Sequence, residues 1–340
     1  MFGWKEFLGH LCGGGTMANL EALWVAGQLN PGKTILASEQ AHYTHSRISS
    51  VLQLAFEKIP CDTQGRMDVD ALEQRLARGG VGTIVATMGT TATGSVDPLP
   101  EMLQLRGQFG FRLHADAAYG GYFVLAENLA ENARRSFARI GEADSIVIDP
   151  HKHGLQPYGC GCVLFRDPAV GRLYKHDSPY TYFSSAELHL GEISLECSRP
   201  GASAAALWAT QKLLPLIRGG EFAKGLEKGR SAALKFGQAI AESKMFVPAF
   251  EPELDILCFV PHGGSIAEIS ARSRRTFEAA AGNGLHLAVA ELPVRFWKEL
   301  EPENGRDTVT CLRSVLMKPE HLQWVEAIVK RLDRAAVDVR

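Results

Sequence analysis

Short apolar runs alternate with amphipathic segments through residues 1–215, and this alternation restricts the possible folds more than any other feature. Five runs read as strands, each short and bounded by Gly, Pro or Asp, as is typical of strands buried in a parallel sheet. They are Thr34–Ala37, Thr83–Thr87, Phe111–His114, Ser145–Ile148 and Cys160–Phe165. Helical patterns lie between strands, at Met17–Gln28 and at Val69–Ala77, where Asp68 is the predicted N-cap. The alternation predicts a three-layer α/β domain whose ligand site lies at the carboxyl ends of the strands.

The pattern changes near the C-terminal third of the chain. An apolar helix is predicted at Ala204–Leu216 and a long amphipathic helix at Glu221–Ser243. After them the predicted order is strand Asp255–Val260, helix Ile266–Ala281, strands His286–Leu292 and Thr308–Leu316, and helix Glu320–Leu332. This order predicts a small α+β domain, residues 218–340, after a large domain, residues 1–217.

Charge and composition exclude several classes of protein. The net charge of -2 gives no general attraction to nucleic acid or to anionic membranes. No apolar run approaches the ~20 residues of a membrane span, and the N-terminus lacks the layout of a signal peptide, so a cytoplasmic location is the default expectation. Seven scattered cysteines without a C-x-x-C pair indicate reduced thiols rather than disulfides or zinc.

Lys152 is the first candidate for chemistry. In the run SIVIDPHKHG it follows an apolar strand, at the edge where a site is expected in this kind of sheet. A lysine becomes a Schiff-base nucleophile when burial or neighbouring cations lower its pKa. A solvated loop lysine is the ordinary alternative for a lysine taken alone, so the neighbouring motifs must decide between the two.

Asp116 ends another apolar strand, in the run FRLHADAAYGG. A carboxylate at that position can bind the protonated pyridine nitrogen of pyridoxal phosphate (PLP) and keep the ring cationic. Asp116 precedes Lys152 by 36 positions, which leaves room for a helical crossover to a further strand. A cap on the following turn is an equal alternative for this residue alone.

Three further segments fit around a flat phosphorylated cofactor. The run CGGGTMANLEAL is a glycine-rich turn leading into a helix, whose free N–H groups and dipole favour a phosphate, with Thr16 as an added donor. It matches neither the dinucleotide fingerprint nor the P-loop. The run SEQAHYTHSR could lay His42 on a ring face, and TMGTTATGSVDP offers the hydroxyls of Thr90 and Thr91. Each segment alone would be an ordinary structural loop.

Together and in this order, the segments resemble the group II PLP-dependent decarboxylases. That family includes glutamate, aromatic L-amino-acid, histidine and archaeal tyrosine/aspartate decarboxylases. The resemblance is specific from about Gly9 to Phe165 and looser from there to the C-terminus. It implies the PLP fold-type I architecture with a mostly parallel sheet, PLP as cofactor, a homodimer, and removal of the α-carboxylate of a small-molecule amino-acid substrate.

The resemblance also implies roles for single residues. SEQAH is similar to the family segment whose histidine stacks on PLP, which gives His42 that role. ATMGTTATGSVDP resembles the segment that places a threonine, here Thr91, near the cofactor. HADAAYGG is similar to the family's HVDAAYGG, which implies Asp116 at the pyridine nitrogen and Ala118 beneath the ring.

The remaining motifs complete this set. DPHKHG resembles the family's PHK signature, which implies Lys152 as the Schiff-base lysine with His151 beside it. GGGTMANL is similar to the phosphate turn and gives Gly15 and Thr16 as phosphate ligands. TCLRSVLMKP resembles the strand whose arginine, here Arg313, reaches the substrate carboxylate. The expected catalytic residues are Lys152, His42 and Asp116.

Two departures from the family pattern affect these expectations. Full-length members carry a long segment before the phosphate turn, which here begins by residue 12, so we expect a truncated dimer surface with exposed apolar side chains. HKHGLQPYG is more like archaeal decarboxylases and sphingosine-phosphate lyases, and CSRPGASA resembles the S-R-P-G of that lyase. Arg199 could thus contact a cofactor or substrate phosphate across the dimer, or pair within the fold. A retro-aldol carbon–carbon lyase and an inactive PLP-fold remnant that binds a partner therefore stay as alternatives.

Two smaller hypotheses concern histidines and tyrosines. His151 and His153 could share a face and bind a metal, but no third ligand stands at a suitable spacing, so no metal is expected. The family has a mobile loop with a catalytic tyrosine in the region of Tyr174, Tyr180 and Tyr182, and the sequence does not decide which of these corresponds to it.

Overall fold

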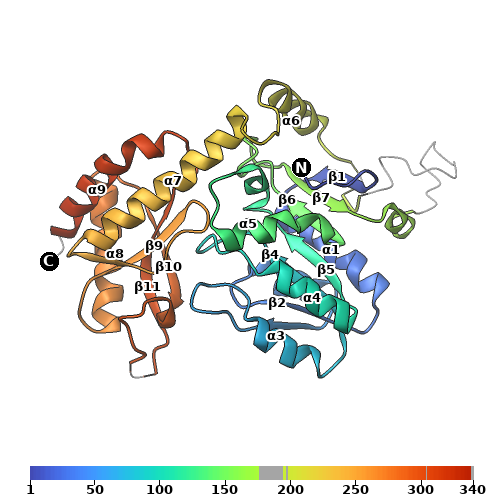
Figure 1. The fold of residues 1–340 in the computed structure, drawn as a ribbon, viewed down its shortest axis with the longest axis horizontal. Coiled ribbons are helices and arrows are strands. Elements are labelled where there is room, and N and C mark those ends of the chain that lie inside the picture. The colour runs from blue at the N-terminus through green and yellow to red at the C-terminus, as the bar shows by residue number, and fades with distance from the viewer. Residues whose placement is uncertain (176–193, 197, 304, 338–340) are drawn as a thin grey trace.

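The computed structural model describes residues 1–175, 194–196, 198–303 and 305–337. Figure 1 shows a large part built around one sheet, followed by a smaller part with a second sheet. The expected division between residues 217 and 218 falls in the connection between α6 (Gly201–Leu213) and α7 (Glu221–Glu242). As a domain boundary it remains a prediction.

The large sheet has seven strands in the order β1-β7-β6-β5-β4-β2-β3. Their bounds are β1 (Leu8–Cys12), β2 (Thr34–Ser38), β3 (Phe56–Ile59), β4 (Val81–Thr87), β5 (Arg112–Asp116), β6 (Ser145–Ile148) and β7 (Gly161–Phe165). The run β6-β5-β4-β2-β3 is parallel. At one edge β7 pairs antiparallel with β6, and β1 pairs antiparallel with β7. The predicted mostly parallel sheet is therefore confirmed.

Helices cover both faces of this sheet because successive strand residues point to opposite sides. In β6, Ile146 and Ile148 belong to the buried cluster under α3, α4 and α5, whereas Val147 packs with residues of α1 on the other face. The helices are α1 (Gly15–Leu29), α2 (Thr44–Val51), α3 (Val69–Leu76), α4 (Leu99–Phe109) and α5 (Glu131–Ala138). This is the predicted three-layer α/β arrangement.

Local signals account for several of these boundaries. The Asp68 side chain accepts a hydrogen bond from Ala71 N at 3.0 Å, so the predicted N-cap of α3 is confirmed. Gly110 ends α4 in the left-handed conformation, which glycine adopts without a steric penalty. The sequence patterns missed the edge strands β1 and β3, whose residues are partly exposed and show no strong apolar period.

The C-terminal part is an antiparallel four-stranded sheet in the order β10-β11-β9-β8, packed against helices. Its strands are β8 (Phe246–Pro248), β9 (Ile256–Pro261), β10 (Ala288–Pro293) and β11 (Thr308–Val315). Helices α7 and α8 (Ile266–Gly282) pack against this sheet, and α9 (His321–Val337) packs against α7 and α8. The Ser265 side chain and Glu268 form a capping box at the start of α8.

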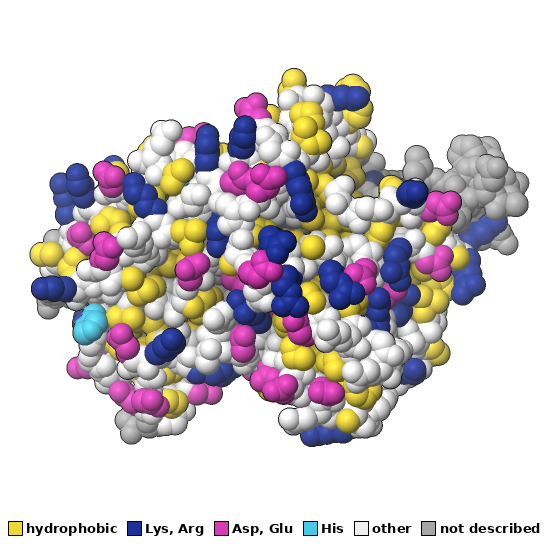
Figure 2. Space-filling model, viewed as in Figure 1, with side chains coloured by type: hydrophobic (Ala, Val, Ile, Leu, Met, Phe, Trp, Pro, Cys, Tyr) yellow, Lys and Arg dark blue, Asp and Glu magenta, His cyan; other side chains and the backbone are white. Residues whose placement is uncertain are grey.

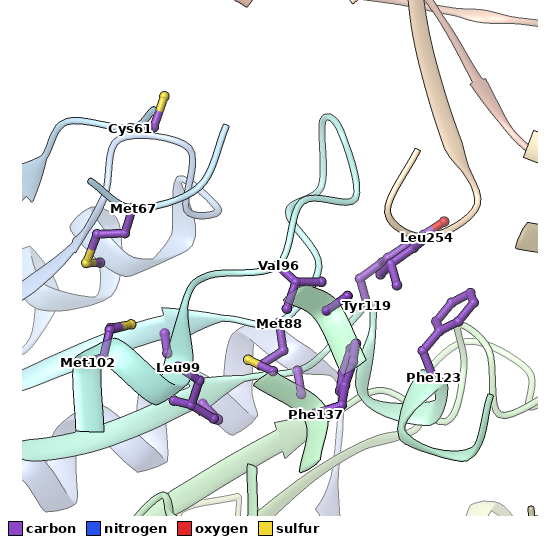
Figure 3. Close-up of a cluster of buried hydrophobic side chains, with 14 of the residues drawn as sticks. Cys61, Met67, Met88, Val96, Leu99, Met102, Tyr119, Phe123, Phe137 and Leu254 are labelled. Carbon is purple, nitrogen blue, oxygen red and sulfur yellow. The ribbon is translucent and has the colours of Figure 1, made fainter. Parts of the chain in front are cut away.

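The two parts share one buried apolar cluster. Leu254 and Ile256, which lead into and begin β9, pack in the same cluster as Met88 and Val96 of the large part. Figure 3 shows Leu254 beside Tyr119 and Val96. The connection between the parts is therefore a packed interface rather than a solvated linker.

Candidate active site

A cavity of about 690 Å³ lies at the carboxyl ends of the parallel strands, next to the start of α1. Parallel strands bring the residues that follow them to one edge of the sheet, which is where ligands bind in such folds. All eight residues expected to hold the cofactor line this cavity: Gly15, Thr16, His42, Thr91, Asp116, Ala118, His151 and Lys152. Their contact with a cofactor remains a prediction.

Lys152 stands in the turn after β6 with its amine against a buried carboxylate. Its Nζ lies 3.0 Å from Asp149 Oδ2, and the lysine side chain is 33% exposed whereas that of Asp149 is 2% exposed. Burial raises the pKa of Asp149, although the charge of Lys152 opposes the shift. The cavity wall thus presents an accessible amine whose partner is a poorly hydrated acid.

Asp116 ends β5 and is held by a second buried side chain. Its Oδ2 lies 2.7 Å from Nε2 of His45, which is fully buried, and its Oδ1 accepts a hydrogen bond from Ala118 N at 3.2 Å. Burial alone would favour the neutral acid, but the hydrogen bond and charge of His45 outweigh it and hold the pKa of Asp116 well below its usual range. Asp116 is therefore an anion in the cavity.

The glycine turn before α1 packs so closely on the lysine loop that side chains are excluded. A Cβ at Gly15 would lie 2.6 Å from Asp149 Oδ2, and one at Gly14 would lie 3.1 Å from Cε1 of His151. Gly14 has φ of 149°, a backbone conformation that favours glycine. Since α1 starts at this turn without a side-chain cap, its first N–H groups and its dipole are directed at the cavity.

His42 is a neutral ring at the side of the cavity. Its Nδ1 lies 2.5 Å from Thr44 Oγ1 and 3.3 Å from Thr44 N, which fixes the ring, and the ring packs against Tyr43. Burial lowers the pKa of His42, with Lys152 contributing in the same direction. A neutral flat ring is suited to stacking on an aromatic cofactor.

His151 and His153, which the sequence left as a possible shared face, have separate surroundings. Nδ1 of His151 accepts from Cys160 N at 3.3 Å, and its ring stacks on Tyr158 at 5.0 Å. Both nitrogens of His153 face buried partners, Asp255 and the carbonyl oxygen of Tyr119. The part of the chain that the structure describes contains no group of three side chains suited to a metal ion.

Thr90 and Thr91, proposed together as hydroxyl donors, differ in position. Thr91 lines the cavity, but the Thr90 hydroxyl is buried within its own turn, 2.7 Å from Thr93 Oγ1. Arg313 does not line the cavity. Its Nε and Nη2 donate to the carbonyl oxygens of Ala92 and Thr91 at 2.9 and 2.6 Å, so Arg313 supports the loop that carries Thr91. Contact of Arg313 with a substrate carboxylate remains a prediction.

The other expected residues are only partly placed. Tyr174 is buried against Trp24, with ring centroids 5.0 Å apart, whereas Tyr180 and Tyr182 lie outside the described residues. Arg199 donates to the carbonyl oxygen of Leu11 in β1 at 3.2 Å.

Several residues at or beside the cavity were missed from sequence. Asp149 stands inside the DPHKHG motif and directly follows β6, so its position was a usable signal. His45 gave none, because it pairs with Asp116 across 71 positions. Tyr119 and Glu196 also line the cavity, and Glu196 accepts from Gly13 N at 3.0 Å.

The residues present fit PLP. The glycine turn and the start of α1 line the cavity with backbone N–H groups, the anion at Asp116 suits a protonated ring nitrogen, and the amine of Lys152 faces the same cavity. The volume is also within the roughly 300–1,000 Å³ range of small-molecule sites.

Comparisons with known proteins agree with this geometry. The profile of the family described as "Pyridoxal-dependent decarboxylase conserved domain" matches residues 16–261. A probable L-tyrosine/L-aspartate decarboxylase of Methanothermobacter thermautotrophicus is 32% identical over 256 residues, which cover 74% of this chain and 67% of that protein. The aspartate 1-decarboxylase of Aliivibrio fischeri is 29% identical over an alignment of 359 positions, which covers 96% of this chain and 62% of that protein. The chain thus spans about two thirds of the length of these relatives.

Solved structures show the same fold. Mouse CSAD superposes with a TM-score of 0.82 at 21% identity, covering 98% of this chain and 73% of that one. Oryza sativa TDC with PLP and tryptamine superposes with a TM-score of 0.81 at 18% identity, covering 98% and 70%. These likenesses confirm the predicted PLP fold-type I class, and with the family match they show that the chain belongs to the pyridoxal-dependent decarboxylases, with PLP as its cofactor.

Proposed function

We propose that this protein is a PLP-dependent carboxy-lyase that removes the α-carboxylate of an amino acid. The observation that carries the proposal is the convergence of Lys152, Asp116 and the Gly13–Thr16 turn on one cavity. When bound, PLP supplies an aldehyde that links to amines and a cationic ring that accepts the electrons released as a bond to the substrate Cα breaks.

The residues of the chain then have distinct tasks. The turn at Gly13–Thr16 binds the phosphate through N–H groups and fixes one end of the ring. Asp116, kept anionic by His45, would hold a proton on the ring nitrogen of the cofactor. His42 and Ala118 both line the cavity, and they would restrict the orientation of the bound ring.

Lys152 would provide the amine that holds the cofactor. Its neighbour Asp149 can accept a proton from Nζ or return one to it, because Asp149 Oδ2 lies 3.0 Å from Lys152 Nζ. Which bond at Cα breaks depends on how the substrate is oriented to the ring, so groups that bind the α-carboxylate decide the reaction. Arg313 and the Thr91 loop that it supports are the proposed determinants of that orientation.

The active assembly is proposed to be a cytoplasmic homodimer. Helix α6 has no buried residue, and it carries Trp208, 64% exposed, with Leu213 and Ile217 exposed beside it. Figure 2 shows apolar side chains on this projecting part of the molecule. Gln156, in the loop after Lys152, donates to Thr210 of α6 at 2.8 Å, so a second copy on α6 would adjoin the cavity. None of the described helices is long and apolar enough to cross a membrane.

The proposal is tested by carbon dioxide release from a panel of amino acids after PLP is added to the purified protein. Tyrosine and aspartate come first in the panel, because the relatives carry those names. Release from one or a few of them, abolished in Lys152→Ala, supports the carboxy-lyase. Aldehyde formation from a phosphorylated amino alcohol without carbon dioxide release would instead favour the retro-aldol lyase. Neither reaction, with no visible absorption band from bound PLP, would favour the inactive remnant.

A further inference from the structure

A buried network of three polar side chains joins the large part to the C-terminal part beside Lys152. Nε2 of His153 lies 2.8 Å from Asp255 Oδ2, and the Tyr119 hydroxyl donates to Asp255 Oδ1 at 2.7 Å. Nδ1 of His153 lies 2.9 Å from the carbonyl oxygen of Tyr119. The exposed fractions are 4% for His153, 1% for Asp255 and 8% for Tyr119, so these groups are satisfied by one another rather than by water.

The geometry determines the position of all but one of the hydrogen atoms that join the network. A carbonyl oxygen only accepts, so Nδ1 of His153 carries a hydrogen and donates it to Tyr119 O. The Tyr119 hydroxyl donates to Asp255, and burial beside that carboxylate raises the pKa of Tyr119 well above its usual value. One further proton lies between His153 Nε2 and Asp255 Oδ2. If it is on the histidine, the pair is an ion pair, and if it is on the aspartate, both side chains are neutral; in either case the pair has no net charge. A neutral, fully hydrogen-bonded group is tolerated in the interior.

The network adjoins three segments of the candidate active site. His153 directly follows Lys152, and Tyr119 follows Ala118 and itself lines the cavity. Asp255 immediately precedes β9, in which Cys258 is paired with Arg313 of β11. Figure 3 shows Leu254, the residue before Asp255, beside Tyr119. One set of hydrogen bonds thus connects the lysine turn, the ring-face loop and the strand pair that holds Arg313.

The His153 ring has little freedom to move. It makes T-shaped contacts with the rings of Tyr119 and Phe123. Its centroid lies 4.6 Å from that of Tyr119 and 5.0 Å from that of Phe123, with interplanar angles of 84° and 72°. The next residue, Gly154, is equally confined, because a Cβ there would lie 2.4 Å from the Tyr122 hydroxyl oxygen. The Lys152 side chain is one third exposed, so its own packing restrains it only in part. The backbone of the lysine turn is held mainly by the packing of His153 and Gly154.

We propose that His153, Asp255 and Tyr119 are positioning residues that set Lys152 relative to the C-terminal sheet and so to Arg313. This inference rests on the proposed function, because it assigns the network to the geometry of that reaction. It predicts that the network acts on the turnover step, since a shift of about 1 Å in a reacting group can reduce a rate by about a hundredfold.

The test compares two isosteric substitutions two residues apart in the full chain. Asp255→Asn keeps the shape of the network but exchanges the carboxylate and its shared proton for an uncharged amide with a fixed N–H, so the ion-pair form is lost. Glu253→Gln is the matched control: Glu253 is also buried at the joint, where it accepts from Arg66 Nη2 at 2.5 Å and Val96 N at 2.7 Å, but it does not contact His153. For both variants we would measure kcat and KM of the reaction, the melting temperature, and the rate at which an acetylating reagent labels Lys152 in PLP-free protein.

Asp255→Asn is expected to lower kcat at least tenfold with KM changed less than threefold, and to change the labelling rate of Lys152 at least threefold. Glu253→Gln is expected to leave both quantities within twofold even if it melts at the same temperature as Asp255→Asn. Equal effects of the two variants on kcat and on labelling would overturn the proposal and leave the network a purely structural one. If Asp255→Asn does not fold, Tyr119→Phe, which removes one hydroxyl, takes its place with the same criteria.

The labelling arm separates this inference from the proposed function. It requires neither PLP nor substrate, so it still reports on Lys152 if the wild-type protein releases no carbon dioxide. An inactive wild type whose Lys152 labelling still responds to Asp255→Asn alone would refute the proposed function and support the network. An active wild type with unchanged labelling and unchanged kcat in Asp255→Asn would refute the network and support the function.

Discussion

The close approach of the glycine turn to the lysine loop is tested by Gly15→Ala. In a helix, Ala is favoured over Gly by up to about 1 kcal/mol, so propensity alone predicts a small stabilisation. The new Cβ, however, would lie 2.6 Å from Asp149 Oδ2 and 3.1 Å from its Cγ. Ordinary contact begins at 3.4 Å, so the carboxylate must retreat by about 0.8 Å.

The direction of the net effect follows from what holds Asp149. Its side chain is 2% exposed and contacts Lys152 Nζ at 3.0 Å, so it cannot swing into solvent. Overpacking typically costs about 1–3 kcal/mol, and weakening a buried charged hydrogen bond costs a similar amount. The clash therefore outweighs helix propensity, and the protein should lose about 1–4 kcal/mol of stability. Because the same turn binds the phosphate, PLP affinity should fall at least tenfold, which is about 1.4 kcal/mol.

The assay is titration of the purified protein with PLP, followed by the visible absorption band, together with urea unfolding without PLP. Gly107→Ala is the matched control, because Gly107 lies in α4 and a Cβ there meets nothing within 4 Å. It should stabilise by about 0.5–1 kcal/mol and leave PLP affinity unchanged. A Gly15→Ala protein that behaves like Gly107→Ala in both measurements would refute the close-approach argument.

Three further predictions concern charge, pH and assembly. Asp149→Asn removes the carboxylate that holds Lys152 Nζ at 3.0 Å, so the amine is less tightly held and its acetylation, followed by mass spectrometry, should be several-fold faster. Burial lowers the pKa of His114 to about 3, so between pH 6.5 and 3 the unfolded chain binds more protons than the folded one. The free energy of unfolding therefore decreases as the pH is lowered through this range. His114→Gln should remove up to ~1.4 kcal/mol per pH unit of that slope in urea unfolding. Trp208→Asp places a charge on exposed α6 and should shift sedimentation from dimer to monomer; an unchanged dimer would exclude α6 from the interface.

The sequence predicted the sheet and the cavity well because their signals are local. Buried parallel strands appear as short apolar runs, and the residues that follow such strands meet at one edge by topology alone. Lys152, Asp116 and His42 were therefore found from motifs placed after predicted strands, and the glycine turn from the helix that follows it; all of them line one cavity.

What the sequence left open depends on contacts between distant residues. His153 follows the lysine and was weighed as a metal ligand with His151, but its partner Asp255 is 102 positions away. His45 likewise gave no signal beside His42, because its role comes from Asp116. Arg313 was expected at the substrate, and its hydrogen bonds to the Thr91 loop could not be inferred from a strand motif. Pairings of this kind are set by tertiary packing and leave no periodic pattern.

The central claim is that Lys152 is the residue that holds PLP. Borohydride converts a lysine–cofactor linkage into a stable secondary amine, so the reduced, digested protein can be read by mass spectrometry. We predict a pyridoxyl-phosphate mass increment on the peptide that contains Lys152, absent after Lys152→Ala. An increment on a different lysine, or none in protein that shows the visible band, would contradict the account.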